Sequence, residues 1–176
     1  AAIVGLGKDE VHSVCEQTGV HLANLNCPGQ IVVSGDAEKM NIACEAAKSA
    51  GAKRAIPLTV AGAYHSPLMQ PAQAGLAEVL SKVDLNSPKI PVFSNVTGQM
   101  HAEAETIAKT MVDQVTSPVK WEACIREMIA DGVKRFIELG PGSALTGFMR
   151  RIDRDVQILN VGDSDSLVKT AEVLNA

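Results

Sequence analysis

The order of strand-like and helix-like segments over residues 2–60 limits the possible folds more than any other feature of the chain. Four short runs are rich in apolar residues, and two segments with apolar residues at helical spacing lie between them. A Pro-Gly turn signal after the second run predicts a hairpin. The resulting order, strand–helix–strand–strand–helix–strand, is typical of a split β-α-β or ferredoxin-like unit. We expect strands at residues 2–6, 20–26, 30–34 and 53–60, and helices at residues 8–16 and 37–49.

After residue 60 the pattern changes to longer helical segments that alternate with short apolar strands. This alternation predicts a parallel sheet with helices on its faces. The chain is therefore expected to be an α/β protein, with a small α+β subdomain at residues 1–60 and part of a larger subdomain at residues 61–176. We expect helices at residues 66–83, 104–115, 117–131, 144–152 and 164–174, and strands at residues 90–94, 133–139 and 156–161.

Composition excludes several classes of function. The net charge is −4 and the basic residues are not clustered, so nucleic acid is not an expected partner. The four cysteines are scattered and have no histidine at metal spacing, so we expect free, buried thiols in a reducing compartment and no metal site. No apolar run is long enough to span a bilayer, so no membrane contact is expected.

His65 lies where a strand-like run passes through small residues into a predicted helix. Ser66 is expected to cap this helix, and Pro67 to occupy its first turn. Backbone fixed on both sides would hold the ring, while its edge could still face a cleft. Because imidazole titrates near neutral pH, His65 is a candidate general base. From the residue pattern alone, a hydrogen-bonded structural histidine is the favoured interpretation, and catalysis is the alternative.

Two further segments have a functional and a structural interpretation. The loop of residues 138–143 joins a predicted strand to a helix and could present backbone N–H groups to an anion, although a tight packing turn also explains it. Asn24 and Asn26 lie on one face of a predicted strand and could line a cleft, whereas Asn26 could instead cap the following turn. The sequence contains no Gly-x-Ser-x-Gly nucleophile elbow.

Several segments together resemble the malonyl-CoA:acyl carrier protein transacylase family, and the resemblance runs along the whole chain. It implies a ferredoxin-like subdomain inserted into an α/β-hydrolase-like core, of which residues 61–176 would form the C-terminal part. The segments that carry the resemblance are Asn26–Gln30, Gly62–Met69, Asn95–Gly98, Gln114–Trp121 and Glu138–Thr146.

The resemblance implies transfer of malonyl from coenzyme A to the pantetheine thiol of acyl carrier protein through a covalent acyl-serine, in fatty acid synthesis. His65 matches the general base, and Gln114 matches the position whose main-chain carbonyl orients the histidine ring. Asn26 matches an amide near the acyl and pantetheine cleft. Tyr64 matches a gate whose bulk favours malonyl over methyl-branched units. The resemblance implies no cofactor: malonyl-CoA is a substrate, and the carrier protein bears the pantetheine arm.

The chain also departs from the family pattern. The nucleophilic serine, the arginine that binds the malonate carboxylate and the glutamine of the oxyanion hole belong to the N-terminal half of the family's sequence, which this chain does not match. We therefore expect the histidine half of a site, inactive by itself, from a protein that is monomeric when full-length. The expected location is the bacterial cytoplasm, with a plastid or mitochondrion as the alternative. A polyketide synthase acyltransferase domain and a non-catalytic module that binds carrier protein stay open as other functions.

Overall fold

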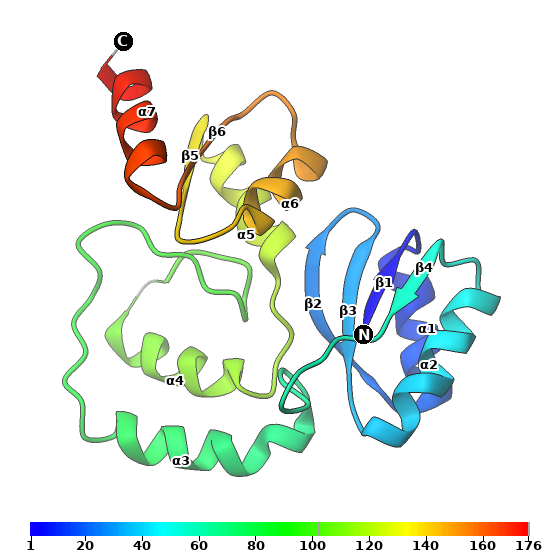
Figure 1. The fold of residues 1–176 in the computed structure, drawn as a ribbon. Helices are drawn as coiled ribbons and strands as arrows, with labels where there is room; N and C mark the ends of the chain where they lie inside the picture. The colour runs from blue at the N-terminus through cyan, green and yellow to red at the C-terminus, as the bar shows by residue number, and fades with distance from the viewer. Residues whose placement is uncertain (102, 176) are drawn as a thin grey trace. The chain divides into compact units, whose positions relative to one another are not determined.

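The computed structural model describes residues 1–101 and 103–175 (Figure 1). The chain divides into two compact units, residues 1–124 and 125–176. The subdomain boundary expected near residue 60 stays a prediction. None of the helices in the described ranges is long and apolar enough to cross a membrane.

The first unit begins with the predicted order of strands and helices, which the structure confirms. The elements are β1 (Ala2–Val4), α1 (Lys8–Thr18), β2 (His21–Cys27), β3 (Gln30–Ser34), α2 (Ala37–Ser49) and β4 (Arg54–Ile56). Their strands form an antiparallel sheet in the order β2-β3-β1-β4. Ile3 in the central strand β1 lies opposite Ile31 of β3 and Ala55 of β4.

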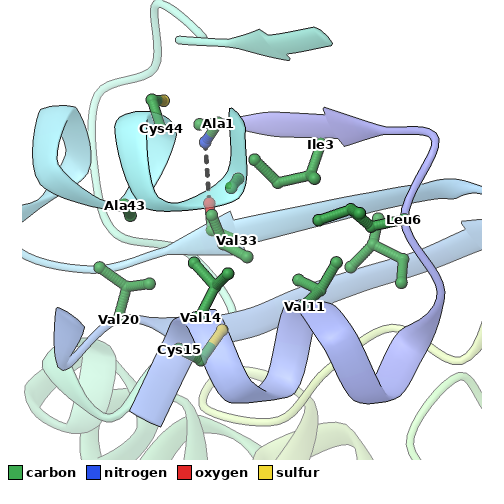
Figure 2. Packing of buried hydrophobic residues seen from close by; sticks show 12 residues of the cluster. Ala1, Ile3, Leu6, Val11, Val14, Cys15, Val20, Val33, Ala43 and Cys44 are labelled. Atoms are coloured by element: carbon green, nitrogen blue, oxygen red, sulfur yellow. Dashed lines mark hydrogen bonds between the residues drawn. The ribbon is translucent and has the colours of Figure 1, made fainter. Parts of the chain in front are cut away.

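Helices α1 and α2 pack on this sheet and enclose the main hydrophobic core (Figure 2). Ile31 and Val33 of β3 are both buried, because alternate residues of a strand point to the same face. Val11 and Val14 on one face of α1 meet them across the core. All four cysteines are free and buried, as predicted.

The ends of α2 follow the local sequence. The Asp36 side chain accepts a hydrogen bond from the Glu38 N–H at 3.3 Å, which caps the first turn. Gly51 follows the helix with φ of +100°, a left-handed conformation that costs glycine little.

Proline interrupts the pairing of two predicted strands, one of which is shorter than expected and one of which does not form. β4 ends at Ile56, and Pro57 has no N–H to continue the ladder. The strand predicted over residues 90–94 is wrong: only Phe93 pairs, in an isolated bridge with Met100. Pro91, the second residue of that segment, has no N–H to donate to a ladder.

The helix predicted from residue 117 begins instead at Trp121 as α5 (Trp121–Ala130). The reason is that Val119 pairs with the edge of β2. Its N–H donates to the Ala23 carbonyl, and its carbonyl accepts from the Leu25 N–H, both at 2.8 Å. An extended residue in this pairing cannot be part of a helix.

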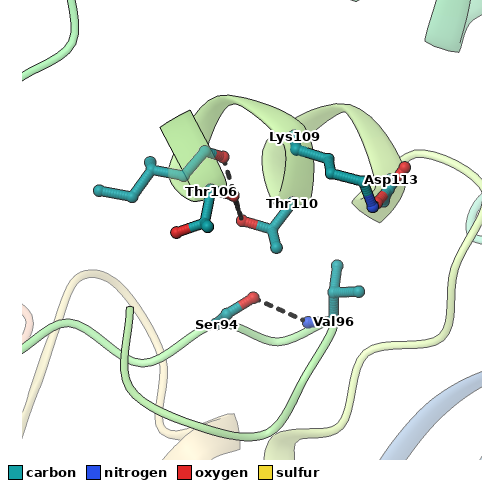
Figure 3. Close-up of polar contacts among 7 residues, drawn as sticks. Ser94, Val96, Thr106, Lys109, Thr110 and Asp113 are labelled. Atoms are coloured by element: carbon teal, nitrogen blue, oxygen red, sulfur yellow. Dashed lines mark hydrogen bonds and ion pairs between the residues drawn. The ribbon is translucent and has the colours of Figure 1, made fainter. Parts of the chain in front are cut away.

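The helix predicted over residues 66–83 is divided into the 3₁₀ turn η1 (Pro67–Met69) and α3 (Gln70–Leu80). α3 packs against α4 (Ala104–Gln114). Figure 3 shows polar contacts along α4, where Lys109 pairs with Asp113 at 2.9 Å and the Thr110 hydroxyl donates to the Thr106 carbonyl at 2.9 Å. These contacts support the last turns of α4, which ends at Gln114.

The second unit confirms the expected alternation of parallel strands and helices. Its elements are β5 (Arg135–Leu139), α6 (Ala144–Ile152), β6 (Gln157–Val161) and α7 (Ser164–Asn175), preceded by the end of α5. β5 and β6 pair in parallel, with Ile137 opposite Leu159. Helix α6 buries Thr146, Met149 and Ile152 on one face.

Candidate functional site

His65 lies in a tight turn directly before η1, with the left-handed φ of 60°. No other non-glycine residue in the described part of the chain has a positive φ. Such a backbone costs a non-glycine residue about 1–3 kcal/mol, so its surroundings must hold it in place. Backbone strain of this kind is common at functional sites, and it marks His65 as a candidate.

Ser66 occupies the predicted position before Pro67, but its expected helix-capping contact is wrong. Its side chain is fully buried, and the hydroxyl donates backwards to the Ala63 carbonyl at 2.6 Å. No hydrogen bond runs from the hydroxyl to the first turn of η1. The side chain therefore closes the turn around Tyr64 and His65.

The ring of His65 contacts the end of α4. Its Nδ1 lies 3.0 Å from the Gln114 main-chain oxygen, which is 49 positions further along the chain. Because a carbonyl oxygen can only accept, Nδ1 must carry the hydrogen, and Nε2 is then the basic nitrogen of the neutral ring. This arrangement can accept a proton at Nε2 while the carbonyl stabilises the charged ring.

Gln114 is tied into the sheet through the segment that follows it. Its side-chain amide donates to the Ser117 carbonyl at 2.9 Å. Two residues later, the hydrogen bonds of Val119 to β2 fix this segment against the edge of the sheet. The oxygen that contacts His65 is therefore held by the same sheet that forms the core of the unit.

His65 also lines a cavity of about 470 Å³ within the first unit. The other walls include His12 and Glu16 of α1 and His21 at the start of β2. Nε2 of His12 lies 3.8 Å from the Glu16 carboxylate, and both side chains are exposed. From the sequence, His12 and His21 are expected at solvated polar or edge positions and Glu16 has no predicted role, although the four-residue spacing of His12 and Glu16 on a polar helix face was an available signal.

Cys15 lines the same cavity but is a poor nucleophile. Burial raises the pKa of its thiol to about 11, and the neighbouring negative charge of Glu16 adds to the shift. The thiol therefore stays protonated near neutral pH, whereas reactive cysteines need the thiolate.

The four predicted site residues are not all brought together. His65 and Gln114 are in contact, whereas Asn26 and Tyr64 are not among the residues that line the cavity. Asn26 is buried within β2, and Tyr64 is 47% exposed in the turn beside His65. Their roles in substrate binding stay predictions.

In the second unit, the loop of residues 138–143 does not leave the start of α6 open to an anion. The Glu138 carboxylate accepts hydrogen bonds from the N–H groups of Leu145 at 3.0 Å and Thr146 at 2.8 Å. Partial desolvation of Glu138 opposes ionisation, but these hydrogen bonds and that of the Thr146 hydroxyl outweigh it and lower the pKa. Within residues 1–101 and 103–175, no cluster of His, Cys, Asp and Glu side chains could hold a metal ion.

Comparison with known proteins supports one family. The chain is 41% identical to the malonyl CoA-acyl carrier protein transacylase of Bacillus subtilis, over 99% of this chain and 56% of the relative. The solved transacylase of Clostridium perfringens matches with a TM-score of 0.95 and 38% identity, over 99% of this chain and 56% of that one. A malonyl-transacylase solved with its type II polyketide acyl-carrier protein matches with a TM-score of 0.94 and 36% identity, over 98% and 57% of the two chains.

The chain thus spans about half the length of the relatives it matches, at 56% of the Bacillus protein. The family model described as the acyl transferase domain matches residues 1–167, which is nearly the whole chain. The chain therefore belongs to the acyl transferase domain family.

Proposed function

We propose that this chain supplies the histidine half of a malonyl-CoA:acyl carrier protein transacylase site in fatty acid synthesis. The observation that carries the proposal is the 3.0 Å contact between His65 Nδ1 and the Gln114 carbonyl, which leaves Nε2 to act as the base. The similarity to malonyl transacylases supports malonyl as the acyl group and a carrier protein as the acceptor.

In the proposed reaction, the nucleophilic serine comes from a part of the enzyme that this chain does not match. Nε2 of His65 removes the serine proton as the oxygen attacks the malonyl thioester, and the protonated ring then returns the proton to the departing coenzyme A thiol. In the second half, the same nitrogen removes the proton of the pantetheine thiol. The sulfur attacks the malonyl-serine ester, and the proton returns to the serine.

We also propose that the chain consists of parts of two subdomains. Residues 1–60 would form a ferredoxin-like subdomain, and residues 61–176 the C-terminal part of an α/β-hydrolase-like core. The antiparallel order β2-β3-β1-β4 with two helices packed on the sheet supports the first assignment. The parallel pair β5–β6 followed by α7 supports the second.

One observation favours a second acceptor. A similar solved protein is a malonyl-transacylase in complex with a type II polyketide acyl-carrier protein, so a polyketide carrier is an alternative to the carrier of fatty acid synthesis. Rates of malonyl transfer to the two classes of carrier protein distinguish them. The named relatives are bacterial, which supports a bacterial cytoplasm as the location.

The test is malonyl loading by a full-length transacylase that contains this chain, followed by intact mass. His65→Ala should slow loading by about 10²–10⁴-fold, the usual contribution of a general base. His101→Ala is the matched control, because this histidine lies outside the cavity and should leave the rate unchanged. If the His65→Ala variant loaded malonyl at the wild-type rate, the proposal would be contradicted.

Residues 1–176 produced alone give a second test. We expect no malonyl adduct, because the proposed nucleophile lies outside this sequence. An adduct on the isolated chain would place the nucleophile among its own residues and would overturn the proposed division of the site.

A further inference from the structure

Two side-chain hydrogen bonds flank the contact between His65 and Gln114, and the proposed chemistry uses neither of them. On one side, the Ser66 hydroxyl donates to the Ala63 carbonyl at 2.6 Å. On the other, the Gln114 amide donates to the Ser117 carbonyl at 2.9 Å. Each bond closes a short turn, and each turn presents one partner of the His65–Gln114 contact.

The turn of residues 63–66 depends on its polar contacts. His65 has the strained φ of 60°, and the Tyr64 side chain is 47% exposed, so only part of the Tyr64 side chain packs against the protein. Ser66 is fully buried, and its main-chain carbonyl accepts from the Met69 N–H at 3.0 Å. Ser66 therefore connects the turn backwards through its hydroxyl and forwards through its carbonyl.

The turn of residues 114–117 shows the same dependence. The Ser117 N–H lies 3.4 Å from the Gln114 oxygen, which is a long hydrogen bond, so the 2.9 Å bond from the Gln114 amide is the shorter connection. Beyond it, Val119 is fixed to β2. The direction of the Gln114 oxygen thus depends on the Gln114 side chain as well as on the backbone.

From this geometry we infer that the side chains of Ser66 and Gln114 are positioning residues that keep His65 in the Nδ1–H tautomer, with Nε2 free to accept a proton. The inference deepens the proposed function and rests on it. The tautomer of a histidine is set by the hydrogen bond that its other nitrogen makes. Without either side-chain bond, the ring or its carbonyl partner moves, and the Nε2–H form, which cannot act as the base, becomes populated.

The kinetic test uses the full-length transacylase with Ser66→Ala and Gln114→Met, which remove one donor each and keep both main-chain carbonyls. We expect kcat to fall by about 10- to 100-fold, as small misplacements of a catalytic group do, with KM for malonyl-CoA within about twofold. Ser66→Cys keeps a weak donor of similar size and should recover part of the rate. Ser81→Ala is the matched control, because Ser81 makes the same kind of hydroxyl bond, to the Glu78 carbonyl at 2.8 Å, on the exposed end of α3.

The second readout is the tautomer of His65, observed through its ring nitrogen signals in ¹⁵N NMR of the same variants. Wild type should show the Nδ1–H form, and both variants a mixture. A wild-type kcat, or an unchanged tautomer in both variants, would overturn the inference. If His65→Ala stops loading while Ser66→Ala and Gln114→Met load normally, only the positioning inference fails. If His65→Ala loads normally, the proposed function itself fails.

Discussion

The Glu138 carboxylate holds Thr146 through two hydrogen bonds to the same oxygen, Oε2. The Thr146 N–H donates at 2.8 Å and its hydroxyl at 2.6 Å. Oε1 accepts from the Leu145 N–H at 3.0 Å. A side chain near the end of strand β5 therefore caps the helix that follows, and a negative charge lies at the positive end of α6.

We expect Glu138→Gln to lower the free energy of unfolding of this unit by about 1 kcal/mol, the usual value of a helix cap, with part of the charge effect screened by water. Because the pKa of Glu138 is lowered on folding, its contribution is present above the unfolded-state pKa and is lost as pH falls through the folded-state pKa. Thermal unfolding at pH 7 and pH 3 should therefore show a difference from wild type that shrinks in acid. Glu172→Gln, an exposed change late in α7, is the control.

Gly98 and Gly75 should respond in opposite directions to the same substitution. Gly98 has φ of +78°, and a Cβ there would lie 2.8 Å from the Ala123 Cβ. Gly98→Ala should therefore lower the free energy of unfolding by about 1–3 kcal/mol. Gly75 is in α3, and a Cβ there would meet open space. Gly75→Ala should therefore raise the free energy of unfolding by about 0.4–1 kcal/mol. Chemical denaturation of both variants measures the difference, and equal midpoints would contradict this account.

Cys15 should react slowly with alkylating agents in the folded protein. Burial raises the pKa of its thiol to about 11, so at pH 8 its thiolate is roughly 100-fold rarer than in the unfolded chain. The stabilisation from the protonated thiol is present below the unfolded-state pKa and is lost as pH rises toward about 11. Iodoacetamide labelling read by mass spectrometry, with and without denaturant, tests this. Rapid labelling of folded Cys15 would be the contrary result.

Tyr64 is the candidate for acyl-group selectivity, and its exposure makes the test clean. Because its side chain is 47% exposed, Tyr64→Ala should unfold near the wild-type temperature. We expect the ratio of methylmalonyl to malonyl loading to rise by about 10- to 100-fold, the usual value of one methyl group in a pocket. The measurement is competitive loading of the full-length transacylase with both thioesters. Tyr64→Phe keeps the ring and should keep the wild-type ratio.

The strand and helix order at residues 2–60 could be predicted because local signals agree with the fold. Alternating apolar residues, the Pro-Gly turn, Asp36 and Gly51 each act within a few positions of the chain. The strands over residues 53–60 and 90–94 were overextended across Pro57 and Pro91, which are local signals, whereas the start of the helix after residue 117 depended on a distant partner. The start of α5 is displaced because Val119 pairs with β2, a partner far back in the sequence.

The candidate site, like the fold, could be predicted from the sequence only in part. The pattern around His65 indicated a ring at a corner, but its left-handed φ and the backward hydrogen bond of Ser66 arise only when the turn closes. The partner Gln114 followed from family resemblance, because no local pattern connects residues 49 positions apart. His12 and Glu16 looked like ordinary surface residues, since a polar helix face has the same spacing whether or not a cavity lies beside it.

The central place of β1 in its sheet has a kinetic consequence. Ala2 lies opposite Val32 on one side and Ile56 on the other, so both neighbours of β1 come from far along the chain. Only the β2–β3 hairpin, where Cys27 faces Gln30, pairs locally. Loop closure must therefore precede every pairing of β1, and such non-local pairing is slow. The hairpin should gain protection from amide exchange first, and β1 should follow only when long stretches of chain have come together on either side of it.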